Sequence, residues 1–398
     1  MAAIPVEIAG SPHTRVLFDD CGRGALAVVF CDTPTGTEPN RIWGAPIFQK
    51  AGFSVLGFVA RSPHWFYAAD TAPLIERTRP VLSRFGKIVP FGWSMGGYAA
   101  LKYGRTVGAD VAVAFSPQIS IAPGAVGSFD RRFQRHFHAA RHDSMTIRAE
   151  DICRRPLVVY DPLDAIDRGH AKMLVALGPA VVAVPAPGGA RIGPMPLIEA
   201  NLMTDFLKAA QEDGTVPATA ARVRHLFRRA RRVSPSYWRG LAEALRMRRR
   251  PGAAVACYRN ALALGPTPAV RVGLVSALIE AGERIGIARL IAAAEAAEPK
   301  GAHLWHEIAL AYLMLQRPLP AARATERAIE LMPDDAWLRI TLGEAQIAAK
   351  QPIRAAAALA EAEARAGADL GAWRALATLY AQAGDKAGID RAMARLKG

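Results

Sequence analysis

Short apolar runs alternate with longer amphipathic stretches through the first half of the chain. Seven runs rich in Val, Ile, Leu and Phe predict strands: residues 15–20, 25–33, 53–61, 87–94, 110–117, 155–162 and 180–187. Continuous apolar runs are typical of strands that are buried on both faces of a parallel sheet. The helical stretches between them predict right-handed β-α-β crossovers. We therefore expect a doubly wound, mostly parallel α/β sheet in residues 1–212.

The pattern changes near residue 235, where strand-like runs stop and a helical repeat begins. Aligning the chain on its tryptophans indicates about five units at the roughly 34-residue period of tetratricopeptide repeats. The first unit places large and small residues at the offsets of that repeat: Trp238, Leu241, Ala242, Leu245, Ala254, Tyr258, Ala261 and Pro266. Residues 235–398 therefore resemble tetratricopeptide-repeat proteins, which implies an all-α solenoid that binds a protein or peptide.

Residues 213–234, between the two parts, predict a basic linker helix. In the segment ARVRHLFRRARRV (221–233), apolar residues recur at helical spacing and arginines fill most other positions. One interpretation is contact with an acidic polymer or an anionic surface. The other is a helix whose apolar stripe closes the end of the repeat stack while its arginines face water.

Composition narrows the class of protein. The apolar runs are too short for a membrane-spanning helix. The first residues lack the positive and apolar regions of a secretory signal, so we expect a cytoplasmic protein. The net charge of +15 permits a polyanionic partner, but a coding bias toward arginine and alanine also explains it. Four scattered cysteines favour neither a disulfide framework nor a zinc site, and no motif indicates a cofactor or metal.

The segment PFGWSMGGYAALKYG (90–104) places Ser94 between Gly92 and Gly96, directly after a predicted strand and before a predicted helix. This arrangement is typical of a nucleophile elbow. Residues 15–210 therefore resemble the α/β-hydrolase family. The resemblance implies a catalytic acid at Asp164, with Asp161 in reserve, and an oxyanion hole formed by the amides of Met95 and Thr33.

The base that this resemblance requires is missing from its expected place. Ala190 or Arg191 stands where the family carries histidine, and an arginine stays protonated at any working pH. His64, after the third long predicted strand, is the candidate from elsewhere in the chain. Four further histidines are less suited to the role, because three lie in an arginine-rich excursion and one follows Asp164 closely: His136, His138, His142 and His170.

Two hypotheses of function follow. In the first, the protein is a pseudo-enzyme or adaptor: a hydrolase-like domain with an incomplete Ser/Asp/His triad, coupled to a protein-binding repeat scaffold. In the second, it is a serine esterase or acyltransferase, with Ser94, Asp164 and His64 as catalytic residues, acting on a glycan or other acyl ester. The phrases SPHWF and FSPQISIAP are similar to stretches in hydrolase-like proteins of bacterial surface-polysaccharide and glycoprotein export, which gives the second hypothesis its substrate class.

Overall fold

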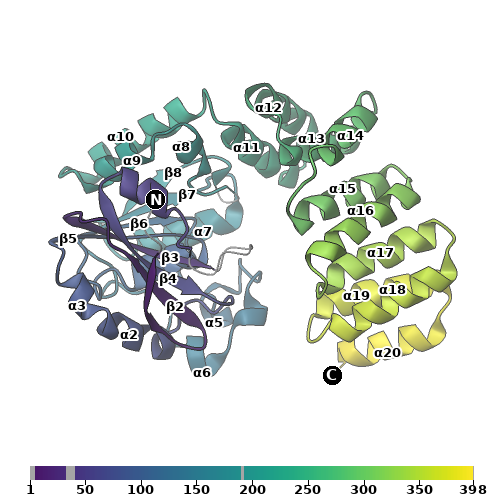
Figure 1. The fold of residues 1–398 in the computed structure, drawn as a ribbon, viewed down its shortest axis with the longest axis horizontal. Helices are drawn as coiled ribbons and strands as arrows, with labels where there is room; N and C mark the ends of the chain where they lie inside the picture. Colours follow the sequence, from purple (N-terminus) through teal and green to yellow (C-terminus); the bar gives the residue numbers. More distant parts are fainter. Residues whose placement is uncertain (1–4, 33–40, 190–191, 398) are drawn as a thin grey trace. The chain divides into compact units, whose positions relative to one another are not determined.

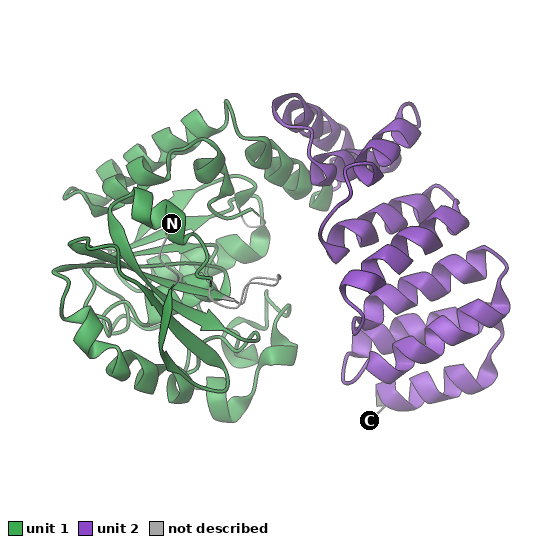
Figure 2. Ribbon diagram, in the orientation of Figure 1, with its two compact units in different colours: residues 1–248 green, residues 249–398 purple. Residues whose placement is uncertain are grey.

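The computed structural model describes residues 5–32, 41–189 and 192–397. The chain divides into two compact units, residues 1–248 and residues 249–398 (Figure 2). The first unit is a mixed α/β sheet with helices on both faces, and the second unit is entirely helical in its described part.

The described strands of the first unit form one sheet in the order β1-β2-β4-β3-β5-β6-β7-β8 (Figure 1). β1 and β2 pair antiparallel, β2 pairs antiparallel with β4, and all later pairs are parallel. The seven predicted runs all form strands. β1 escaped prediction because it is short and half exposed. The bounds are β1 (Val6–Gly10), β2 (Thr14–Asp19), β3 (Ala25–Asp32), β4 (Phe53–Ala60), β5 (Lys87–Trp93), β6 (Val111–Phe115), β7 (Arg155–Tyr160) and β8 (Val182–Pro185).

Helices cover both faces of this sheet, and each face has its own apolar core. One core receives side chains from α2, α4 and α7, and the other from α1, α8, α9 and α10. The helix bounds are α1 (Ala45–Lys50), α2 (Ala68–Arg77), α3 (Arg79–Leu82), α4 (Met95–Lys102), α5 (Pro123–Val126), α6 (Ala139–His142), α7 (Ala165–Val175), α8 (Met195–Glu199), α9 (Met203–Gln211), α10 (Val216–Ala230) and α11 (Pro235–Met247).

The predicted basic linker helix is α10, and it packs on the sheet unit. Its apolar stripe belongs to the core beneath β8, α8 and α9, and not to the repeat stack. Arg222 and Arg229 pair with Glu212 and Asp205 of the α9 region at 3.4 and 3.5 Å. Removing the stripe from the core would expose large apolar surface, so α10 is part of this unit. The buried stripe consists of Ala220, Val223, Leu226, Phe227 and Ala230.

α11 also belongs to the sheet unit, although its sequence reads as the first helix of the first repeat. The Glu199 carboxylate accepts hydrogen bonds from the hydroxyls of Ser234 and Ser236, both at 2.5 Å. The backbones of Gly188 and Gly240 touch, because a β-carbon at Gly188 would lie 2.4 Å from the carbonyl carbon of Gly240. The unit boundary therefore falls inside the first predicted repeat, and not at residue 212 or 235 as the sequence suggested.

The second unit consists of α12 followed by helix pairs that stack in order: α13 with α14, α15 with α16, α17 with α18, and α19 with α20 (Figure 1). Predicted seam residues such as Ala254, Tyr258 and Leu376 are fully buried. The bounds are α12 (Pro251–Leu264), α13 (Pro268–Glu280), α14 (Ile287–Glu295), α15 (Ala302–Met314), α16 (Pro318–Leu331), α17 (Ala336–Ala348), α18 (Pro352–Arg365), α19 (Leu370–Ala383) and α20 (Lys386–Lys397).

The glycine contact under α11 generates a prediction. Alanine stabilises a helix relative to glycine, yet a β-carbon at Gly240 would lie 2.5 Å from the carbonyl oxygen of Gly188. We expect Gly240→Ala to loosen α11 and to raise amide hydrogen exchange across residues 235–247 by at least about tenfold. Gly252→Ala in α12 is the matched control, because its β-carbon would meet nothing within 4 Å. Equal exchange in the two variants would contradict the docking.

Candidate functional site

Ser94 occupies a sharp turn between β5 and α4. Its φ of 52° lies in the left-handed region, which costs a residue other than glycine about 1–3 kcal/mol and clusters at functional sites. The chain can turn here because glycine has no β-carbon. A β-carbon at Gly92 would lie 2.1 Å from the Gly96 backbone, and one at Gly96 would lie 2.0 Å from the Phe30 carbonyl oxygen. The structure shows a sharp turn from strand to helix at this point, and the Ser94 side chain is half-exposed at its tip.

Of the two predicted oxyanion donors, the amides of Met95 and Thr33, only Met95 lies within the described residues. Met95 is the first residue of α4, so its amide lies at the positive end of the helix dipole. Its thioether sulfur accepts a hydrogen bond from the amide of Trp65 at 3.4 Å. Thr33 lies outside the described residues.

The side chain that contacts the Ser94 hydroxyl is Gln118, which the sequence analysis missed. The indole nitrogen of Trp65 donates to Oε1 of Gln118 at 3.2 Å, and Nε2 of Gln118 lies 3.3 Å from Oγ of Ser94. An indole N–H can only donate, so it fixes the orientation of the amide and presents the NH₂ group to the serine. Gln118 therefore donates a hydrogen bond to Ser94 and cannot take its proton.

His64 is a buried side chain with both ring nitrogens engaged away from Ser94. The Thr14 hydroxyl donates to Asp70 at 2.7 Å, so it accepts from Nε2 of His64 at 2.8 Å. Nδ1 of His64 accepts from the amide of Phe66 at 2.9 Å. Burial lowers the pKa of the imidazole to about 4, so it is neutral at neutral pH. Within the described residues, no histidine nitrogen is hydrogen-bonded to the Ser94 hydroxyl.

The two predicted acids, Asp164 and Asp161, accept hydrogen bonds from backbone amides in the region between β7 and α7. The Asp164 carboxylate caps α7 by accepting from the amides of Ile166 and Asp167 at 2.8 and 2.9 Å. Oδ1 of Asp161 accepts from the amide of Leu163 at 2.9 Å, and the residue is fully buried. The structure therefore does not bring Ser94, Asp164 and His64 together as a hydrogen-bonded triad.

His170 is fully buried and holds the excursion between β6 and β7. Its Nδ1 accepts from the amide of Ile119 at 3.2 Å, and its Nε2 donates to Asp130 at 2.9 Å. Burial would raise the pKa of the Asp130 carboxyl, but hydrogen bonds from His170 and Arg132 lower it below its usual range. In the same excursion, the ring of His136 lies 5.4 Å from that of Trp65, while Nε2 of His142 bonds the carbonyl of His64 at 3.1 Å.

A second group that the sequence analysis left unassigned lies beside this site. The buried carboxyl of Asp167 accepts from the hydroxyl of Ser116 at 3.0 Å and from the amide of Asp161 at 2.5 Å. Ser116 follows β6 and has a φ of 43°, so strained residues end two neighbouring strands of the sheet. Polar residues directly after buried strands were the available signal, and they point to Ser116 and Gln118 as clearly as to Asp164.

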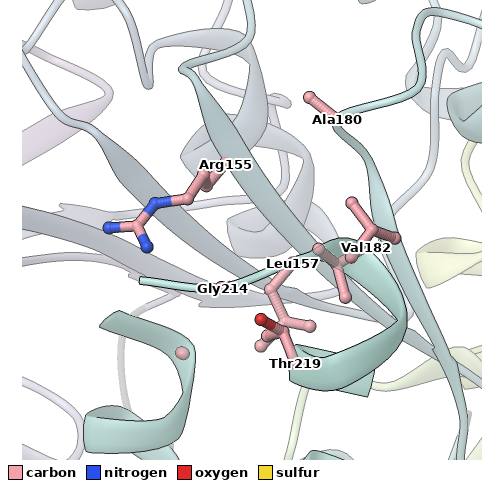
Figure 3. Close-up of a pocket in the computed structure, with 8 residues that line it drawn as sticks. Arg155, Leu157, Ala180, Val182, Gly214 and Thr219 are labelled. Carbon is pink, nitrogen blue, oxygen red and sulfur yellow. The ribbon is translucent and has the colours of Figure 1, made fainter. Parts of the chain in front are cut away.

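Three hollows of the first unit lie apart from Ser94. One of about 260 Å³ is lined by Asp161, Asp164 and the end of α11. An open groove between α9 and α10 measures about 530 Å³. The third, between β7, β8 and α10, measures about 90 Å³ and has room for a few water molecules only (Figure 3). The Arg155 side chain at its edge donates to the carbonyls of Gln211 and Glu212 at the end of α9.

The described residues contain no cluster of three or more His, Cys, Asp or Glu side chains placed to hold a metal ion. None of the helices in the described part of the chain is both long enough and apolar enough to cross a membrane.

The similarity of this chain to known proteins is found in its repeats. The tetratricopeptide-repeat family matches residues 201–341, so the C-terminal part of the chain carries such repeats. No curated protein matches the sequence. The match begins just before α9, so it includes α9, α10 and α11 of the sheet unit.

Solved structures that resemble part of the chain have low sequence identity to it. YrrB, a tetratricopeptide-repeat protein with an unusual peptide-binding site, has 16% identity and a TM-score of 0.32, and the match covers 42% of this chain and 86% of that one. A thermophilic tetratricopeptide-repeat protein from Thermus thermophilus, TTC0263, has 20% identity, coverage of 41% and 90%, and a TM-score of 0.35. Pseudomonas aeruginosa pilF has 15% identity, coverage of 51% and 90%, and a TM-score of 0.36.

The buried carboxyl of Asp167 predicts a pH dependence. Burial raises its pKa from 3.8 to about 7. Between these values the folded protein holds a proton that the unfolded chain releases, so this group makes the free energy of unfolding fall as pH rises through the window. We expect Asp167→Asn to remove this pH dependence. As pH rises through the window, the free energy of unfolding of the variant should increase relative to that of the native protein by up to about 1.4 kcal/mol per pH unit. Urea unfolding at several pH values measures this, and parallel profiles would refute it.

Proposed function

We propose that the protein is a non-catalytic adaptor: a hydrolase-like sheet unit whose serine is hydrogen-bonded to no base among the described residues, joined to repeats that bind a protein or peptide. The single observation that carries the proposal is that the side-chain amide of Gln118 donates a hydrogen bond to the Ser94 hydroxyl. A serine hydroxyl becomes a nucleophile when a neighbour accepts its proton. Gln118, oriented by Trp65, donates at that point instead.

The loop after β8 supports the same proposal. In the α/β-hydrolase resemblance this loop supplies the base, at a place that falls on Ala190 or Arg191, which lie outside the described residues. On either side of them the loop serves to hold α11, through the backbone of Gly188 and the side chain of Ile192. This packing gives the loop a structural role, which supports the adaptor proposal.

The alternative function is a serine esterase or acyltransferase acting on a glycan or other acyl ester. The observation that favours it is the strained backbone of Ser94, which keeps a half-exposed hydroxyl beside the N-terminus of α4. Such an enzyme would need a base from the substrate or from a rearranged histidine, because loss of a triad member typically lowers the rate by several powers of ten.

A fluorophosphonate probe distinguishes the two functions. We expect Ser94 in the native protein to react at least roughly a thousandfold more slowly than an intact serine hydrolase, since no imidazole in the described part of the chain is hydrogen-bonded to its hydroxyl. His64→Gln should react like the native protein, and Ser94→Ala supplies the background. Rapid labelling that disappears in both variants would establish the enzyme and exclude the adaptor.

The repeats generate their own prediction. Leu310 and Met314 lie one turn apart on α15 and are 40% and 44% exposed, although both are large and apolar. We expect Leu310→Glu with Met314→Glu to abolish capture of the partner that the full chain retains in a pull-down, because a charge at an apolar contact removes its burial energy. Met393→Glu, on α20 and 41% exposed, is the matched control and should retain the partner. Capture that survives the α15 changes would place the partner elsewhere.

A further inference from the structure

Three consecutive repeats expose a large aliphatic side chain at the same position. Ile285 is 94% exposed, Leu319 is 51% exposed and Ile353 is 86% exposed. They recur at the period of the repeat, near the start of the second helix of each pair. Ile285 lies two residues before Ile287, the first residue of α14, and the other two are the second residues of α16 and α18. We call these three residues the aliphatic ladder. A single exposed aliphatic side chain is common on protein surfaces, so the feature that distinguishes these three is their recurrence at the repeat period.

The ladder lies along one edge of the solenoid. Each of its residues lies at or just after the turn that joins the two helices of a pair. The first helices α13, α15 and α17 pack on one another in order (Figure 1). Because successive repeats stack with a small, regular rotation, equivalent turns fall on a common edge. The ladder is therefore a line of separate, exposed side chains.

Cations flank every residue of the ladder. The segments 284–289 (RIGIAR), 317–323 (RPLPAAR) and 350–354 (KQPIR) each begin and end with a basic residue and contain no Asp or Glu. All six basic side chains are exposed, and none forms an ion pair or side-chain hydrogen bond with another described residue. The nearest acid in sequence, Glu283, is already paired with Arg259 at 3.1 Å. The six are Arg284, Arg289, Arg317, Arg323, Lys350 and Arg354.

We propose that this edge docks on the surface of an anionic lipid bilayer. Isolated aliphatic side chains can enter the boundary between headgroups and acyl chains, while cations beside them meet lipid phosphates. A folded protein partner would need apolar pockets at the repeat spacing, whereas a bilayer accepts protruding side chains at any spacing. The amphipathic helix α10 cannot insert in the same way, because its apolar stripe is buried in the sheet unit.

Vesicle flotation with the full chain tests the proposal. We expect binding to vesicles of phosphatidylcholine with phosphatidylglycerol, no binding to phosphatidylcholine alone, and weakening as salt is raised. Ile285→Ser with Ile353→Ser should lower the affinity at least about tenfold, because both insertions are lost. Arg284→Gln with Arg354→Gln should lower it by a similar factor and reduce the salt dependence.

Matched controls separate the ladder from other surfaces. Leu331→Ser with Leu370→Ser removes side chains that are 48% and 49% exposed but lie off the ladder, and it should leave vesicle binding unchanged. Arg228→Gln with Arg232→Gln removes exposed charge from the α10 region and should also have little effect. Circular dichroism checks that each variant is folded. Failure of the native chain to bind anionic vesicles, or loss of binding only in the α10 variant, overturns the proposal, and neither result bears on Ser94 or α15.

Discussion

Close backbone contact at the end of β5 is the constraint on which the site depends. A β-carbon at Gly92 or Gly96 would overlap backbone atoms of Gly96 and Phe30, so only glycine lets the strand enter α4 so abruptly. The same contact forces Ser94 to a positive φ and lifts its side chain away from the sheet. Because the strain is held by surrounding backbone, the turn persists whatever chemistry its serine performs.

What the serine can do is decided by its neighbours. A general base must offer a lone pair, and the hydrogen-bonding rules of indole and amide leave the NH₂ group of Gln118 facing Ser94. His64, the histidine that the sequence analysis suggested, is neutral and buried, and its two ring nitrogens are hydrogen-bonded to Thr14 and Phe66. An oriented donor beside a hydroxyl suits recognition of a ligand acceptor better than activation of a nucleophile, which is the physical basis of the adaptor proposal.

Helices α10 and α11 show how a repeat-like sequence can be used by a different unit. α10 buries its apolar stripe under β8, and α11 approaches the loop after β8 through the contact of Gly240 with Gly188. Ser234 and Ser236, which are hydrogen-bonded to Glu199, orient the start of α11. Small residues that would allow two repeat helices to approach closely thus serve equally well against a loop, and the unit boundary shifts into the first predicted repeat.

The sequence by itself determined most of the elements and the period of the repeats, although not the short strand β1. Buried strands, amphipathic helices, the repeat and the glycine-bounded turn at Ser94 are all local patterns, because each depends on residues only a few positions apart. Only the tertiary structure decided which side chains meet: Gln118 with Ser94, His64 with Thr14, His170 with Asp130, and α11 with the sheet unit. These partners are distant along the chain, and their choice depends on exact backbone approach and on which donor finds which acceptor, information that no local pattern carries.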